Sequence, residues 1–179
     1  MATNGKQIRL YNLVFIFVSV IVAIIILSTP QAGAFIEKSA EFGPFAPLFA
    51  GAFYSDVITA PAATAVIFYL GKVQNPFFVA LIGAFGSVAG DYIIFRYIRK
   101  RGVPEIAYLA RKLKIKNKHP YAKYVAMVIA AIIIASPLPD EIGAAIFGAL
   151  KVKTKYFLVI SYTLNFLGIL TVAWLGSVL

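Results

Sequence analysis

The sequence predicts an all-α polytopic membrane protein. In it, an inverted repeat of a re-entrant helical hairpin plus a transmembrane helix follows an extra N-terminal transmembrane helix. Three observations predict this fold. Most residues are apolar, two broken apolar stretches each precede an unbroken one, and positive charge concentrates in a few short segments. No polar linker divides residues 1–179, so we expect a single multi-pass domain in the cell membrane.

The composition excludes an ordinary soluble domain. Of the 179 residues, 61% are hydrophobic and only 13% are charged, whereas soluble domains are about half apolar and about a quarter charged. A soluble core of this size could not bury so much apolar surface, but lipid accommodates it. Cysteine is absent and His119 is the only histidine. Disulfides, thiolate metal sites and a histidine pair are therefore excluded, and we expect no cofactor.

The apolar segments follow a regular order along the chain. Unbroken runs at 10–29, 77–97 and 156–178 are long enough to cross a core of about 30 Å at about 1.5 Å per residue. The first run has an alternative interpretation as a signal peptide cleaved near Ala32-Gly33-Ala34, although it is longer than a usual signal core. Residues 30–43 are polar and turn-rich.

Two further stretches are broken into arms too short to cross alone. Residues 44–72 are interrupted at Thr59-Ala60-Pro61, and residues 124–150 at 136–141 (SPLPDE). Between the two halves, residues 98–120 form a basic loop in which 103–118 predicts a short interfacial helix beginning near Pro104.

The two halves also match in sequence. A shift of 79 residues aligns the pattern A-x-I-F-x-x-x-K-V at 65–73 with the same pattern at 144–152, and Phe78 then meets Phe157. Internal repeats of this kind are typical of transporter folds.

The positive charges decide between crossing and re-entrant hairpins. Ten basic residues stand between Arg96 and Lys123 against Glu105 alone, so most of the net charge of +10 lies there. Two re-entrant hairpins with a cytoplasmic N-terminus place 15 of the 17 basic residues inside, whereas two crossing hairpins place 11 inside. By the positive-inside rule we expect a cytoplasmic N-terminus, a cytoplasmic 98–120 loop and an outside C-terminus. The two repeats then have opposite orientations, and the hairpin tips predict a polar site at mid-depth.

Four carboxylates fall within the predicted membrane segments and are the candidates for transport or proton coupling. They are Asp56, Asp91, Asp140 and Glu141. An intramembrane charge costs several kcal/mol unless it is paired or hydrated, which makes such acids functional candidates. The structural alternatives are a pair between Asp91 and Arg96, and a helix N-cap role for Asp140.

Other residues are candidates for lining a cavity or for helix packing. The face formed by Gly83, Gly86, Ser87 and Gly90 predicts close helix packing, and Asn165 could donate a hydrogen bond across helices. The full set of cavity or packing candidates is Pro61, Gly86, Gly90, Arg96, Ser136, Pro137, Pro139 and Asn165. No Gly-x-Ser-x-Gly motif occurs, and a single Gly-Asp pair is a weak indication of an intramembrane aspartyl protease. We therefore expect no enzyme.

One region resembles a known family. The pattern Gly83-x-x-Gly86-x-x-x-Gly90-Asp91-Tyr92, followed by Arg96 and Gly102, resembles the G-D-x-x-x-Y…G-R…G region of the DedA/VTT membrane proteins. The proline-containing loops, Phe157 and Asn165-x-x-Gly168 are similar too, so the resemblance covers roughly 44–178. It implies opposed re-entrant hairpins and proton- or sodium-dependent translocation of polyprenyl phosphates or phospholipids. It also implies that Asp91 is the family's helix carboxylate and that Asp56 corresponds to the first-hairpin acid.

The second loop differs from the family pattern. Family members carry two arginines near these prolines, which suit a phosphate headgroup, but here Asp140 and Glu141 occupy the loop. The sequence thus predicts a DedA-like proton- or cation-coupled lipid translocase, with a cation-coupled exporter of small solutes or a non-transporting membrane scaffold as alternatives. Expected partners are membrane lipids and not nucleic acid, and a homo-oligomer is compatible with this interpretation. Anionic lipids are expected at Arg99, Lys100, Arg101, Lys112, Lys114 and Lys116.

Overall fold

The computed structural model describes residues 3–56, 58–101, 120–135, 143, 146–148 and 150–179. Within these ranges the chain forms helices and no strand, which confirms the all-α class and the membrane-like character of the helices. The elements are α1 (Thr3–Ser28), α2 (Pro30–Ser39), η1 (Ala40–Phe42), α3 (Phe45–Tyr54), α4 (Ala60–Val73), α5 (Pro76–Arg101), α7 (Pro120–Ala135) and α9 (Thr154–Val178).

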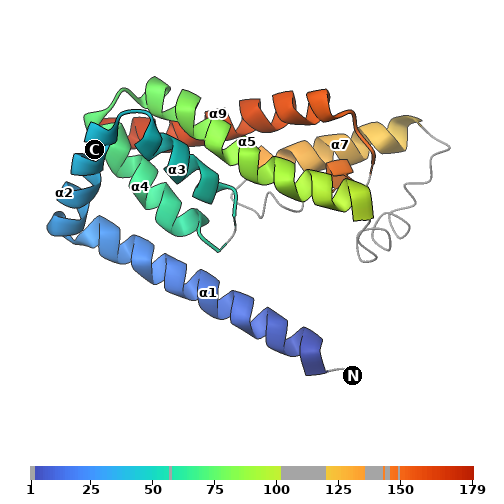
Figure 1. Ribbon diagram of the computed structural model, residues 1–179, viewed down its shortest axis with the longest axis horizontal. Helices are drawn as coiled ribbons and strands as arrows, with labels where there is room; N and C mark the ends of the chain where they lie inside the picture. Colours follow the sequence, from blue (N-terminus) through green and yellow to red (C-terminus); the bar gives the residue numbers. More distant parts are fainter. Residues whose placement is uncertain (1–2, 57, 102–119, 136–142, 144–145, 149) are drawn as a thin grey trace.

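Helices α5 and α9 form an antiparallel pair at the centre of the molecule (Figure 1). The rings of Phe95 and Phe157 stack with centroids 4.2 Å apart near one end, and the rings of Phe77 and Phe166 meet edge to face at 5.4 Å further along. Both helices are long and apolar enough to cross a membrane, over 76–97 and 154–178. They are two candidate spans in the part of the chain that the structure describes, and the bent pair Val14–Ser28 and Pro30–Phe42 gives a third if it is counted as one span.

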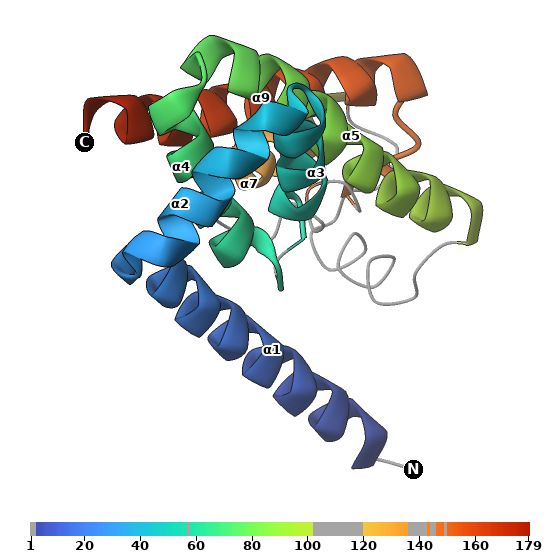
Figure 2. The same cartoon turned by 60° about the vertical axis from the view of Figure 1, so that its left-hand side comes forward.

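Residues 30–43 are helical, and not the turn-rich segment expected from sequence. The chain bends by 91° between α1 and α2, as Figure 2 shows. Pro30 begins α2, a position that needs no amide hydrogen, and Ile36 is buried. Gly33 faces the ring of Tyr69, which a Cβ atom would meet at 2.6 Å. Packing on α4 therefore makes a helix of residues whose local composition favours a loop.

Helices α3 and α4 form an antiparallel hairpin, with its turn between Tyr54 and Ala60 and not at the predicted 59–61. Pro61 lies in the first turn of α4, where proline is well tolerated. At the open end, Gln74 Nε2 donates to the carbonyl oxygens of Ala40 and Gly43 at 3.1 and 3.4 Å. At the turn, Ser55 contacts Ser87, eleven residues into α5, so the hairpin extends about 17 Å along that helix.

The second half is described in part. The predicted interfacial helix at 103–118 and the second loop at 136–142, with Ser136, Pro137, Pro139, Asp140 and Glu141, lie outside the described residues. Two buried apolar clusters flank α9. One contains Ile67, Leu70, Ile169 and Ala173, and the other contains Phe95, Ala130, Phe147, Val152 and Phe157.

Candidate functional site

Asp91 lies in the interface between α5 and α9 and is completely buried, with 0% of its surface exposed. Its Oδ2 accepts hydrogen bonds from Ser161 Oγ at 2.5 Å and from Asn165 Nδ2 at 2.9 Å. Asn165 Nδ2 also lies 3.3 Å from Ser161 Oγ. Ser161 and Asn165 are four residues apart, so one face of α9 presents both. We call these three residues the Asp91 cluster.

A second buried polar contact lies one helical turn away. Ser87 is four residues before Asp91 on α5, and its Oγ is 2.7 Å from Ser55 Oγ at the end of α3. Ser55 Oγ also lies 2.8 Å from the Ser87 carbonyl oxygen. When the Ser55 hydroxyl donates to this carbonyl oxygen, the Ser87 hydroxyl donates to Ser55 Oγ. Both serines are buried. The polar groups of the hairpin turn and the Asp91 cluster therefore follow one side of α5.

Glycines on α5 allow α3 to approach this closely. A Cβ atom at Gly86 would overlap the carbonyl oxygen of Leu48, and one at Gly51 would overlap that of Gly83. At Gly90 the nearest atom would be Ser55 Oγ at 3.4 Å, which is ordinary contact. The small-residue face predicted from sequence thus packs backbone against backbone on the hairpin and brings Ser55 to Ser87.

Asp56 is half-buried in the α3–α4 turn, next to Ser55. Its carboxylate accepts from the Ile58 amide at 3.3 Å and from Thr59 Oγ1 at 3.2 Å, while its carbonyl oxygen accepts from the Thr59 and Ala60 amides at 3.0 and 2.7 Å. This is the pattern of an aspartate that closes a turn and leads into a helix. In this structure Asp56 therefore closes the α3–α4 turn.

Arg96 is exposed and engages its own helix. Its guanidinium donates to the Tyr92 hydroxyl at 2.7 Å and lies 5.9 Å from the centroid of that ring. Of the residues predicted from sequence, the structure brings Asp91 and Asn165 together, while Gly86 and Gly90 pack against α3. It places Asp56 at the adjoining turn, and Pro61 just beyond it.

Ser55 and Ser161 are not among the residues predicted from sequence. Ser161 is the first of three consecutive hydroxyl residues, with Tyr162 and Thr163, in an otherwise apolar span, and its only distinguishing signal is its position one turn before Asn165. Ser55 is a small polar residue directly before Asp56. A serine alone does not indicate a functional site. The two serines are recognised only from their contacts in the fold, Ser55 with Ser87 and Ser161 with Asp91.

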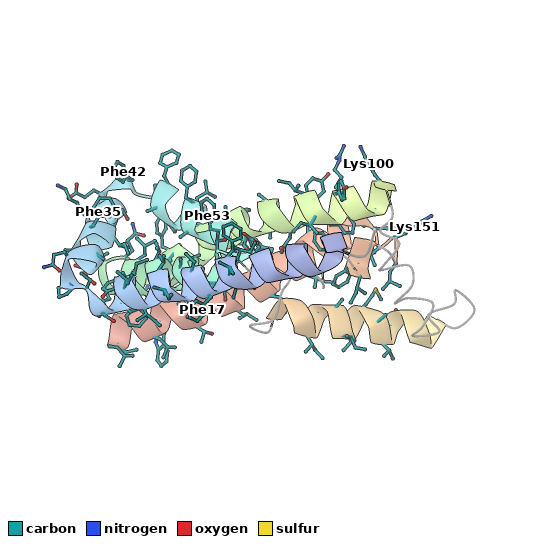
Figure 3. All side chains as sticks on the ribbon, turned by 90° about the horizontal axis from the view of Figure 1, so that it is seen from below. Phe17, Phe35, Phe42, Phe53, Lys100 and Lys151 are labelled. Atoms are coloured by element: carbon teal, nitrogen blue, oxygen red, sulfur yellow. The ribbon has the colours of Figure 1, made fainter. Side chains whose placement is uncertain are left out.

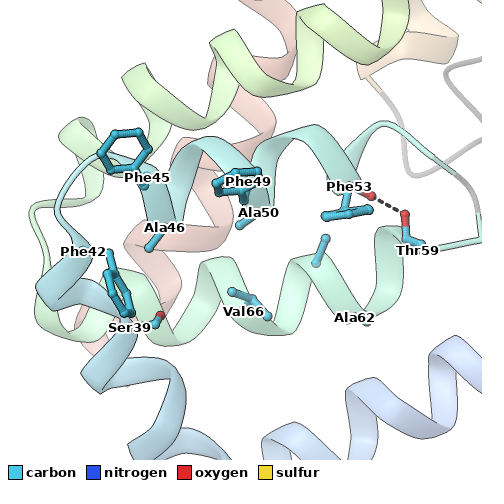
Figure 4. A pocket seen from close by; sticks show the side chains of 11 residues that line it. Ser39, Phe42, Phe45, Ala46, Phe49, Ala50, Phe53, Thr59, Ala62 and Val66 are labelled. Atoms are coloured by element: carbon cyan, nitrogen blue, oxygen red, sulfur yellow. Dashed lines mark hydrogen bonds between the residues drawn. The ribbon is translucent and has the colours of Figure 1, made fainter.

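An apolar groove lies beside the hairpin and apart from the Asp91 cluster. It has a volume of about 670 Å³, and Figure 4 shows phenylalanines of η1 and α3 along it with small side chains of α4 opposite. Thr59 closes one end, where its Oγ1 donates to the Phe53 carbonyl oxygen at 2.7 Å.

Comparisons with protein-family models, with curated proteins and with solved structures found no match for this chain. Among the described residues there is no group of three or more His, Cys, Asp or Glu side chains that could hold a metal ion. The chemistry of the site is therefore considered from its own residues: one carboxylate, one amide and three hydroxyls.

Proposed function

We propose that this chain is a DedA-like membrane transporter, a proton- or cation-coupled lipid translocase in which Asp91 carries the coupling charge. The observation that carries the proposal is the complete burial of Asp91 between two helices that could each cross a membrane. An intramembrane carboxylate costs several kcal/mol. Apolar side chains would hold α5 against α9 at no such cost, so the carboxylate needs a reason beyond packing.

The shape of the α3–α4 hairpin supports a re-entrant arrangement. Its open end lies near the start of α5, because Val73 ends α4 only three residues before Pro76 begins α5, and its turn lies at Ser87. The reach of about 17 Å falls short of a hydrocarbon core of about 30 Å. The hairpin would therefore enter and return on one side. Non-helical backbone at such depth is tolerated only beside protein or water, and here the turn adjoins the Asp91 cluster.

The two apolar clusters support an inverted repeat. Ile67 of the first hairpin packs with Ile169 of α9. The repeat aligns Ile67 with Ile146, and the next residue, Phe147, packs with Phe95 of α5. Each hairpin thus contacts the long helix of the other repeat as well as that of its own repeat, an arrangement that a two-fold axis in the membrane plane would produce. The start of α1 lies toward the end of the molecule where α5 ends, and the C-terminus lies at the other end (Figure 1), as the predicted orientation requires.

Protonation of Asp91 would change how α5 and α9 are held. Bonds from Ser161 and Asn165 to a charged carboxylate are about twice as strong as neutral ones. A proton on Asp91 removes the charge and weakens both bonds, so the helix pair can separate at this level. Deprotonation restores them. This gives the site two states that differ by one proton, which is the minimum for coupling a gradient to alternating access.

The test is lipid translocation by purified protein in vesicles with an imposed pH gradient. Asp91→Asn keeps the shape of the side chain and removes its charge, and we expect it to lower the translocation rate at least tenfold. Asp56→Asn is the matched control, because asparagine can close the same turn, and it should retain most of the rate. Translocation that Asp91→Asn leaves unchanged refutes the carboxylate mechanism.

The acidic character of the site favours a second candidate, a cation-coupled exporter of small solutes. The Asp91 cluster contains no lysine or arginine, and the second loop, which lies outside the described residues, has Asp140 and Glu141 and no arginine in its sequence. A phosphate headgroup is repelled by such a set, whereas a cation is attracted. Replacing Ser136 and Asp140 with arginine distinguishes the two, because the change should raise the rate of a phospholipid translocase and abolish cation export.

A further inference from the structure

Exposed cationic side chains from two distant segments meet at one end of the molecule. Arg99, near the end of α5, donates from its guanidinium to the Val152 carbonyl oxygen and to Thr154 Oγ1, both at 3.0 Å. It also lies 5.7 Å from the centroid of the Phe95 ring. These contacts hold the end of α5 beside the start of α9. Figure 3 shows Lys100 and Lys151 at this end of the molecule.

We call the resulting cationic surface the basic collar. Its members are Arg96, Arg99, Lys100, Lys151, Lys153 and Lys155, and each is exposed. Arg99 is occupied by its contacts to the start of α9, so it positions the others. The carboxylates within the described ranges lie elsewhere, in α2, in η1, in the hairpin turn and inside the α5–α9 interface. The described part of the collar is therefore not balanced by negative charge.

Stability of the fold does not account for these lysines. Lys153 is the N-cap of α9 and Lys155 lies in its first turn, which has no acidic residue. Positive charge is unfavourable at this end of a helix because the peptide dipoles already make it positive. Lys151 has a positive φ of 49°, a conformation in which glycine or asparagine is usual. Three lysines thus occupy positions where other residues would be more stable.

The collar lies where lipid headgroups would be. The apolar stretch of α5 ends at Tyr97, and that of α9 begins at Thr154, so the collar residues lie within two residues of these ends or just beyond them. Tyr97 and Tyr156 are each 54% exposed there, and Lys155 Nζ lies 5.2 Å from the centroid of the Tyr156 ring. Tyrosine is enriched at membrane interfaces because its ring is apolar and its hydroxyl is polar.

We infer that the basic collar binds the anionic headgroups of membrane lipids and selects them over zwitterionic ones. Positive side chains at headgroup depth attract the negative surface of a leaflet rich in anionic lipid, and the rigid link through Arg99 holds several of them together on one surface. The inference requires only that α5 and α9 lie in a bilayer. It does not depend on transport, so either proposal can fail alone.

The test compares spin-labelled phosphatidylglycerol with spin-labelled phosphatidylcholine bound to the full chain in phosphatidylcholine vesicles. We expect wild type to bind the anionic lipid severalfold more strongly, and we expect 0.5 M salt to reduce that ratio. In the triple variant Lys151→Gln/Lys153→Gln/Lys155→Gln, the ratio of anionic to zwitterionic lipid bound should fall close to one. The matched control is Lys38→Gln/Lys72→Gln, which removes exposed cations of α2 and α4 at the opposite end of the molecule. This variant should leave the lipid-binding ratio unchanged.

Two results would overturn the inference. One is equal binding of both lipids by wild type, which would mean that the collar is only a solvated surface that orients the chain. The other is a triple variant that keeps the wild-type ratio. Should the triple variant fail to fold, Lys100→Gln and Lys155→Gln are measured singly, and each must lower the ratio by itself for the inference to stand.

Discussion

Removing the Ser161 hydroxyl tests whether Asp91 is charged in the folded protein. Ser161 Oγ and Asn165 Nδ2 both donate to the same oxygen of the buried Asp91 carboxyl group, at 2.5 and 2.9 Å, and an ionised Asp91 would make both of them charge-assisted hydrogen bonds. Such bonds contribute about 1.5–3 kcal/mol, against about 0.5–1.5 kcal/mol for neutral ones. Ser161→Ala should therefore lower the free energy of unfolding by about 1.5–3 kcal/mol.

The assay is a double-mutant cycle, with unfolding followed in mixed detergent micelles. Ser161→Ala is measured in wild type and in Asp91→Asn, where the partner is uncharged. We expect the cost to be smaller in the second background by on the order of 1 kcal/mol. Thr163→Ala is the control, because Thr163 is exposed on the same helix and donates only to the Val159 carbonyl oxygen; it should change stability by no more than about 0.5 kcal/mol. Equal costs in both backgrounds would refute a charged Asp91.

The remaining predictions concern packing and topology. Gly86→Ala should lower the free energy of unfolding by about 1–3 kcal/mol because its Cβ overlaps the α3 backbone. Gly90→Ala meets only ordinary contact and should be neutral or stabilising by up to about 1 kcal/mol, so equal losses would contradict the packing. Gln74→Ala removes the bonds to η1 and should speed amide exchange across α2 and η1, measured by mass spectrometry. Single cysteines at Glu41 and Asn75 should be labelled from one side of the membrane, and labelling from opposite sides would show that the hairpin crosses.

The long helices and the first hairpin could be predicted because they follow from the length of apolar runs. A span needs about 20 apolar residues, and residues 77–97 and 156–178 provide them. The predicted position of the hairpin turn is wrong by a few residues, because Pro61 indicates a break in the sequence but lies in the first turn of α4. Proline is compatible with the first turn of a helix, and the turn is closed instead by Asp56 and Thr59.

The missed features depend on contacts between distant segments. Helix α2 has a proline, a glycine and charges that favour a loop locally, and it is helical because Gly33 accommodates Tyr69. Ser161 lies 70 residues from Asp91 in sequence, and nothing near either residue indicates the other. Asp91 could be identified because a carboxylate in an apolar helix is costly wherever its partners are.

The central claim is that Asp91 gains and loses a proton within the membrane-embedded protein. Infrared difference spectroscopy of the chain in lipid measures this directly, because a protonated carboxyl group has a carbonyl stretch that a carboxylate lacks. We predict a carbonyl band that appears as pH is lowered and that is missing from Asp91→Asn but retained in Asp56→Asn. A spectrum in which no pH-dependent carbonyl band is lost in Asp91→Asn would contradict the account.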